Sequence, residues 1–167
     1  RVQGKLIFFL KLLQYLNINP NNAVDPALML LDTDYYAFLE YLTTIDQEPT
    51  TIPLRAGASM RCDDYGAFGL AWKSALDLRG SYVRAERYAR VLTNVSTYGM
   101  EDTSDGVFMH LYRQGERRLG MRLSNEATIA SIYAISQQVS TQIFQPLAIY
   151  FQHAAPQSMK AHEAYFR

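Results

Sequence analysis

The stretch that decides the fold is GAFGLAWKSALDLRGSYVRAERYARVL, residues 66–92, in which tyrosines and arginines follow the chain's only tryptophan. Its periodicity predicts two helices that pack on each other, over residues 65–78 and from Ser81 to about Thr93. In the second helix, a rotation of about 100° per residue separates an inward face from an outward face. The inward face would hold Tyr82, Ala85, Tyr88, Ala89 and Leu92, and the outward face Arg84, Glu86, Arg87 and Arg90. Because stacking on nucleic acid needs arginine and tyrosine on one surface, this separation favours a core helix.

Composition narrows the class of protein further. The 167 residues have the length of one domain, and a hydrophobic fraction of 49% is enough for a core, so we expect a single domain over residues 1–167. Lys plus Arg equals Asp plus Glu, 16 each, which argues against direct binding to a phosphate backbone. The lone Cys62 cannot form an internal disulfide, which suggests a reducing compartment. The apolar run at residues 6–16 is too short to span a membrane and predicts a core helix.

Outside residues 66–92, the hydrophobic period indicates both helices and strands. Helices are expected over residues 24–31, 32–45, 52–60, about 124–144 and 158–166. Alternation predicts three antiparallel strands at residues 96–101, 107–113 and 118–123, and the apolar run at residues 146–152 predicts a buried fourth strand. We therefore expect an α+β fold, with a helical layer packed on a small, mostly antiparallel sheet of about four strands.

Motifs that carry catalysis or bind cofactors are missing from the sequence. It has no phosphate loop, HExxH, GxSxG or GxGxxG pattern, and its three histidines do not stand at metal-ligand spacing. The adjacent Asp63 and Asp64 suit a capping region better than a catalytic carboxylate pair. We therefore expect no enzymatic activity, no cofactor and no metal.

Three segments, in this order, carry a resemblance: residues 66–92, GERRLGMRLSNEATIASI (115–132) and PLAIYFQHAAPQSMKAHEAYF (146–166). Their most specific pieces are Gly-x-x-Gly-Leu-Ala-Trp at 66–72, the Arg87-Tyr88 pair, and Phe-x-His-x-x-Pro at 151–156 followed by Tyr165-Phe166. The chain resembles the N-terminal effector domain of AraC-family transcription regulators, of the arabinose-binding type. This resemblance implies a bacterial cytoplasmic regulator that forms a homodimer. It also implies that DNA is bound only by a C-terminal domain with two helix-turn-helix units, which we expect beyond Arg167.

The resemblance implies a small-molecule effector of unknown identity but gives no shared set of contact residues. The abundance of aromatic residues suits an apolar pocket with a few polar anchors. Our candidate ligand-binding residues, each of which could also be plain core, are Phe68, Trp72, Tyr88, Tyr98, His110, Tyr133 and His153. Valines among arginines on the outward face suggest a subunit interface, with the candidates Val83, Arg84, Arg87 and Val91. A protein-interaction module without an effector, and a small enzyme, stay open as alternatives.

Overall fold

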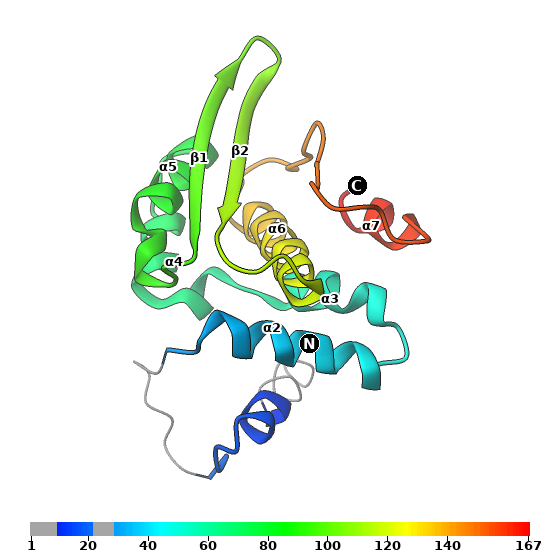
Figure 1. Cartoon of the computed structure of the whole chain (residues 1–167). Coiled ribbons are helices and arrows are strands. Elements are labelled where there is room, and N and C mark those ends of the chain that lie inside the picture. The colour runs from blue at the N-terminus through cyan, green and yellow to red at the C-terminus, as the bar shows by residue number, and fades with distance from the viewer. Residues whose placement is uncertain (1–9, 22–28) are drawn as a thin grey trace.

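The computed structural model describes residues 10–21 and 29–167, and these residues form an α+β fold (Figure 1). A helical segment at residues 10–15 comes first. The later elements are α2 (Asp32–Ile45), α3 (Ile52–Ser59), α4 (Gly66–Lys73), α5 (Leu78–Tyr88), β1 (Ser96–Thr103), β2 (Gly106–Arg113), α6 (Leu119–Val139) and α7 (Lys160–Tyr165). Short 3-10 turns lie at Pro49–Thr51, Cys62–Tyr65 and Ala89–Val91. No helix in these described ranges is long and apolar enough to cross a membrane.

The 21-residue helix α6 is the element around which the others are arranged. In Figure 1 the β1–β2 hairpin stands upright, with α4 and α5 on one side of it and α6 on the other. Helices α2 and α3 lie beneath α6 and both contact it. The C-terminal segment passes along the far side of α6 and ends in α7. Helix α6 therefore lies between α2 and α3 on one side and α7 on the other, while Tyr150 of the C-terminal segment meets Phe108 of the hairpin, with 6.3 Å between the ring centroids.

Two glycines let α2 and α3 approach the backbone of α6 closely. A Cβ atom on Gly57 of α3 would lie only 2.7 Å from the carbonyl carbon of Ala130, and one on Gly120 of α6 would lie 2.5 Å from the Cα of Tyr36. Both distances are far below van der Waals contact, so no larger residue fits at either position without a shift of the helices. These contacts fix the height of α6 above α2 and α3.

The start of α6 is held by a residue of α2. Glu40 Oε1 accepts hydrogen bonds from Arg118 Nε at 2.7 Å and from the backbone nitrogen of Gly120 at 2.8 Å, and Glu40 Oε2 pairs with Arg118 Nη2. No local side chain caps this helix. The hydrogen bond from Arg118 lowers the pKa of Glu40, and burial only partly offsets this effect. A distant carboxylate thus does the work of an N-cap.

The sheet is smaller than the sequence predicts. The strands expected at 96–101 and 107–113 are confirmed as β1 and β2, which pair antiparallel with Ser96 opposite Arg113. The other two strand predictions are wrong. Residues 118–123 form the start of α6, and residues 146–152 are irregular, with Leu147 and Tyr150 89% and 75% exposed. The sheet of the described residues has two strands rather than about four.

Most helix predictions are confirmed, with changes at the ends. The helix expected over residues 32–45 matches α2, and that over residues 52–60 matches α3 apart from its last residue. Helix α5 begins at Leu78, before Gly80, and its cap is Asp77 rather than Ser81. The long helix begins earlier than expected, at Leu119, and ends at Val139. The helix expected at residues 6–16 is confirmed over residues 10–15, and residues 6–9 lie outside the described residues. Most of the turn expected at residues 24–31 lies outside them too, and its described residues, 29–31, are not helical.

Two hydrophobic clusters make up the core. The first gathers Cys62, Phe68, Trp72, Ala85, Ala89 and Ile135, where α4 and α5 meet α6. The second gathers Phe38, Leu39, Leu42, Ile52 and Leu123, where α2 and α3 meet α6. Helix α6 contributes residues to both clusters, so it runs along one side of the region between them.

Candidate functional site

A cavity of about 1080 Å³ lies between the two hydrophobic clusters, and we call it the central cavity. Leu42 and Ile52 line it from one cluster, and Phe68, Trp72 and Ile135 line it from the other. Its volume matches the upper range of pockets that enclose small molecules. The split of the core into two clusters therefore leaves room for a ligand in the interior.

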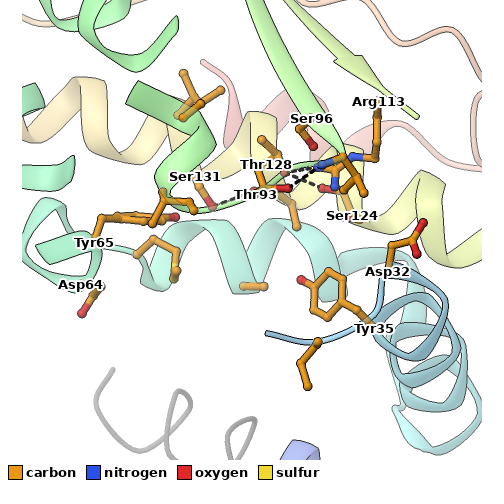
Figure 2. Close-up of a pocket in the computed structure, with 18 of the residues that line it drawn as sticks. Asp32, Tyr35, Asp64, Tyr65, Thr93, Ser96, Arg113, Ser124, Thr128 and Ser131 are labelled. Atoms are coloured by element: carbon orange, nitrogen blue, oxygen red, sulfur yellow. Dashed lines mark hydrogen bonds between the residues drawn. The ribbon is translucent and has the colours of Figure 1, made fainter. Parts of the chain in front are cut away.

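One face of α6 forms a wall of the central cavity. The lining residues of this helix recur at helical spacing and are Ser124, Ala127, Thr128, Ser131, Ile132 and Ile135. Figure 2 shows Tyr65 and Ser131 towards one end of the cavity and Arg113, Ser96 and Thr128 towards the other. The α6 wall is therefore built of small, apolar and hydroxyl-bearing side chains, which leave space for a bound molecule.

The base of the hairpin supplies the polar end of the cavity. Ser96 and Arg113 are direct cross-strand partners, and Tyr98 follows Ser96 on the same face of β1. Arg113 donates from Nε to Asn125 Oδ1 at 2.7 Å and from Nη2 to Thr128 Oγ1 at 2.9 Å. These two bonds hold the guanidinium against α6, beside the cavity.

Three residues of the cavity lining each carry a buried polar atom that has no hydrogen-bond partner among the described residues. These atoms are the Tyr36 hydroxyl, Trp72 Nε1 and Ser96 Oγ; one further buried atom without a partner in the described part of the chain is His162 Nδ1, which lies elsewhere. Leaving a buried donor or acceptor unpaired costs about 1–3 kcal/mol. A ligand whose polar groups reached these atoms would offset this cost.

The phenols of the cavity are hydrogen-bond donors at neutral pH. Burial raises the pKa of Tyr65 to about 12, and a hydrogen bond with Ser131 only partly offsets the rise. Burial also raises the pKa of Tyr35 and of Tyr98, while the positive charge of Arg113 opposes both rises. Arg113 is thus close enough to influence phenols on α2 and on β1, which places its charge at the meeting point of these elements.

Three of the seven candidate ligand-binding residues lie together at the central cavity: Phe68, Trp72 and Tyr98. Tyr88 does not. It is 43% exposed, and Arg87 lies over its ring with 5.9 Å from the guanidinium carbon to the ring centroid, so its expected inward position is wrong. His110 lies on the opposite face of the hairpin from Arg113, where its Nε2 is 2.8 Å from Glu101 Oε2.

Tyr133 and His153 lie on the other side of α6, against the C-terminal segment. The Tyr133 hydroxyl donates to the carbonyl of Arg167 at 2.7 Å. His153 Nε2 lies 2.9 Å from Glu126 Oε1. The seven candidates therefore divide into a group at the cavity, a group behind α6 and two residues on outer surfaces.

Glu126 is the centre of the contacts behind α6. Its side chain is 2% exposed, and it is contacted by Arg122 Nε and His153 Nε2 through Oε1 and by His162 Nε2 through Oε2, each at 2.9 Å. We call these four residues the C-terminal clasp. Close by, the Tyr165 hydroxyl donates to the carbonyl of Ala130 at 2.8 Å. The clasp fastens α7 and the segment before it to the middle of α6.

Three of the four candidate interface residues, on α5 and the 3-10 turn after it, are exposed, and the fourth makes contacts within the chain. Val83 and Val91 are 45% and 71% exposed, and Arg87 is exposed as well. Arg84 instead donates to the carbonyl of Ala71 and to Ser74 Oγ, both at 2.7 Å, and so fastens α5 to the end of α4. Arg84 therefore has a role inside this chain, while the other three leave an accessible face.

Several cavity residues were missed from the sequence, and Arg113 is the most informative of them. Its place in the alternation of β2 puts it on the same face as Leu111 and Met109, which are half-buried. A charged residue that shares a strand face with apolar, inward-facing residues could have been predicted to lie in the interior. The polar atoms of Tyr36 and Ser96 gave no such signal, because their lack of partners is a property of the fold alone.

Among the described residues, no group of three His, Cys, Asp or Glu side chains could hold a metal ion.

Comparison with known proteins gives the chain its family. A search of curated proteins finds no significant match. The model of the N-terminal arabinose-binding domain of AraC transcription regulators matches residues 10–167. The chain therefore belongs to this family of ligand-sensing regulatory domains, which is not a family of enzymes.

Proposed function

We propose that the central cavity binds a small-molecule effector and that its occupancy controls a DNA-binding domain attached beyond this chain. The observation that carries the proposal is that Tyr36, Trp72 and Ser96, which line a largely apolar cavity, each carry a buried polar atom without a partner in the described part of the chain. Such a cavity suits a ligand whose few polar groups pair with these atoms.

Control of an attached domain requires that the effector favour one arrangement of the C-terminal segment over another. Helix α6 supports this step, because Thr128 and Ser131 line the cavity while Glu126 and Tyr133 hold the C-terminal segment. An effector that presses on the first pair displaces the helix that carries the second pair.

The test is a thermal-shift screen of a metabolite library against the chain. An effector at about 100 times its Kd is expected to raise the melting temperature by roughly 5–10 °C. Ala127→Phe, which fills the cavity from α6, should abolish the shift, and Ala67→Phe on the exposed side of α4 is the matched control. If no compound shifts the wild-type protein, or if Ala127→Phe responds as fully as the control, the effector site is disproved.

A second proposal concerns the exposed face of Val83, Arg87 and Val91, which suits a homodimer interface. Arg87→Glu combined with Val91→Asp should convert a dimer into a monomer, because charges at the centre of an interface are unfavourable. Light scattering after size-exclusion chromatography measures the state, and Arg117→Glu, an exposed charge reversal elsewhere, is the control. A wild-type monomer at high protein concentration would refute this interface.

A further consequence is that DNA contacts belong to the attached domain. With 16 basic and 16 acidic residues, this chain alone should show no salt-dependent affinity for duplex DNA in a fluorescence anisotropy titration. Sequence-specific binding by the isolated chain would contradict the proposal.

A further inference from the structure

We infer that the effector carries a single carboxylate, which is bound by Arg113 at the hairpin end of the central cavity. The inference rests on the proposed function, because it names the chemical class of ligand for the same cavity. It depends on the surroundings of Arg113, on the other charges of the lining and on the apolar character of the remaining wall.

Arg113 is a half-buried cation without a counterion in the described part of the chain. Its two hydrogen bonds go to the neutral oxygens of Asn125 and Thr128, and none of the ion pairs among the described residues includes it. A guanidinium has five N–H donors, and these bonds use two of them. The remaining donors are in a geometry that matches the two oxygens of a carboxylate.

The neighbours of Arg113 complete an anion-binding end. Ser96, its cross-strand partner, has a buried hydroxyl to which no described residue is hydrogen-bonded. The phenols of Tyr35 and Tyr98 are close enough to sense the Arg113 charge and, being protonated, can only donate to an anion. A carboxylate oxygen here would meet a charged fork and a free hydroxyl, which is a stronger site than either alone.

The other charges of the lining limit the ligand to one negative charge. Arg55 is paired with Asp46 at 2.6 Å, and Lys11 acts on the same Asp46. Asp32 lines the cavity one helical turn before Tyr35, and Figure 2 shows both residues below Arg113, towards the same end of the cavity. With one cation available and the Asp32 carboxylate at the same end of the cavity, a phosphate or a dicarboxylate would be repelled.

The rest of the cavity wall suits an apolar body. Away from Arg113, the lining includes Phe68, Trp72, Ile132 and Ile135, and the volume of about 1080 Å³ far exceeds that of a carboxyl group. The ligand that satisfies both ends is an aliphatic or aromatic monocarboxylate, with its hydrocarbon part between α4 and α6 and its head at the base of the hairpin.

The test compares acids with neutral amides of the same shape. Octanoate and octanamide form one pair, and 4-phenylbutyrate and 4-phenylbutanamide form another; Kd is measured by calorimetry on the wild-type chain. At least one acid is expected to bind roughly 10- to 100-fold more tightly than its amide, since hydrogen bonds between charged groups add about this much. Arg113→Gln should remove the preference and Arg113→Lys should keep part of it, while Arg117→Gln, an exposed arginine outside the cavity, should leave it unchanged.

Equal binding of acid and amide to the wild-type chain would overturn the inference and leave the proposed effector site intact. An acid preference that survives Arg113→Gln would overturn the assignment to Arg113. Binding of none of the four probes would overturn the monocarboxylate class, whereas the effector site itself is decided by the library screen and Ala127→Phe. Because the comparison of acid and amide uses the wild-type chain, poor folding of an Arg113 variant does not block it.

Discussion

His162 Nε2 lies 2.9 Å from Oε2 of Glu126, and this buried contact fastens α7 to the middle of α6. Glu126 and Thr128 are two positions apart on the same helix, yet one belongs to the C-terminal clasp and the other to the wall of the central cavity. Residues two apart on a helix point in nearly opposite directions, which explains the division. The two faces of α6 can therefore be tested separately.

Loss of the Glu126 carboxylate should weaken the whole domain. Glu126→Ala leaves His153, His162 and Arg122 without a common partner, and removing one member of a buried ionic cluster costs about 3 kcal/mol. The expected fall in melting temperature, roughly 6–12 °C, is measured by calorimetry. Glu101→Ala is the matched control, because Glu101 also pairs with a histidine but is exposed. Equal effects of the two substitutions would contradict the clasp.

Acid should loosen the clasp through His153. Burial lowers the pKa of His153 below its usual 6.5, against the opposing effect of Glu126. The folded state then binds this proton less readily than the unfolded state, so the stability due to neutral His153 is complete above about pH 6.5 and is lost as pH falls through the lowered pKa. Melting temperatures between pH 7.5 and 5 should show this loss in the wild type and in the control His110→Gln, but not in His153→Gln. The same dependence of melting temperature on pH in all three proteins would contradict this role of His153.

The approach of α3 to α6 should not tolerate an added methyl group. Gly57→Ala forces a Cβ into the backbone of Ala130, and overpacking of this kind costs about 1–3 kcal/mol. The same change at Gly80, in α5, meets only the Asp77 and Ala75 side chains at 3.1 and 3.5 Å and should alter stability by less than about 1 kcal/mol. Urea denaturation measures both values, and similar losses would contradict the close packing.

Trp72 should matter more for binding than for stability. Trp72→Phe keeps an aromatic ring in the first hydrophobic cluster and removes a buried N–H that has no partner among residues 10–21 and 29–167, so the change in unfolding free energy should stay within about 1 kcal/mol. If an effector accepts this hydrogen bond, its Kd should rise roughly tenfold. Phe68→Leu, a change in the same wall without a polar atom, is the control. An unchanged Kd in Trp72→Phe would exclude Trp72 Nε1 as an anchor.

Asp32 should oppose an acidic ligand. Asp32→Asn removes a negative charge from the lining at the Arg113 end of the cavity, and the relief of repulsion between partly buried charges is worth about 1 kcal/mol, or roughly fivefold in Kd. Octanoate should therefore bind more tightly to this variant, while octanamide should not change. Asp34→Asn, on the exposed side of the same helical turn, controls for the net charge. Tighter binding of both probes would show that the effect is not electrostatic.

The wrong strand at residues 118–123 shows where sequence periodicity fails. Leu119, Met121 and Leu123 alternate, but Leu119 and Leu123 are also one helical turn apart, so six residues cannot distinguish the two periods. The helix is decided by Glu40, which pairs with Arg118 and accepts from the Gly120 backbone, and by the packing of Gly120 on Tyr36. Glu40 and Tyr36 lie about 80 residues before this segment, so the sequence of residues 118–123 gives no sign of these contacts.

The cavity was predictable only in part for a similar reason. Helical phase correctly turned Ala85 and Ala89 inward, and aromatic content pointed to Phe68 and Trp72. The same reasoning favoured histidines as polar anchors, although His110 and His153 have carboxylate partners on other surfaces. What distinguishes a ligand-facing polar atom is the absence of such a partner, and that depends on the assembled fold.

The opposite faces of α6 have a mechanical consequence. The helix is about 10 Å across with its side chains. Thr128 on the cavity side and Glu126 on the clasp side are therefore separated by one helix rather than by a chain of contacts through many residues. If α6 rotates about its own axis, its residues in the cavity wall and its residues in the clasp rotate together through the same angle. Gly57 and Gly120 let α3 and α2 lie against α6 without an intervening side chain, so any displacement of α6 is felt directly by the backbone of both helices.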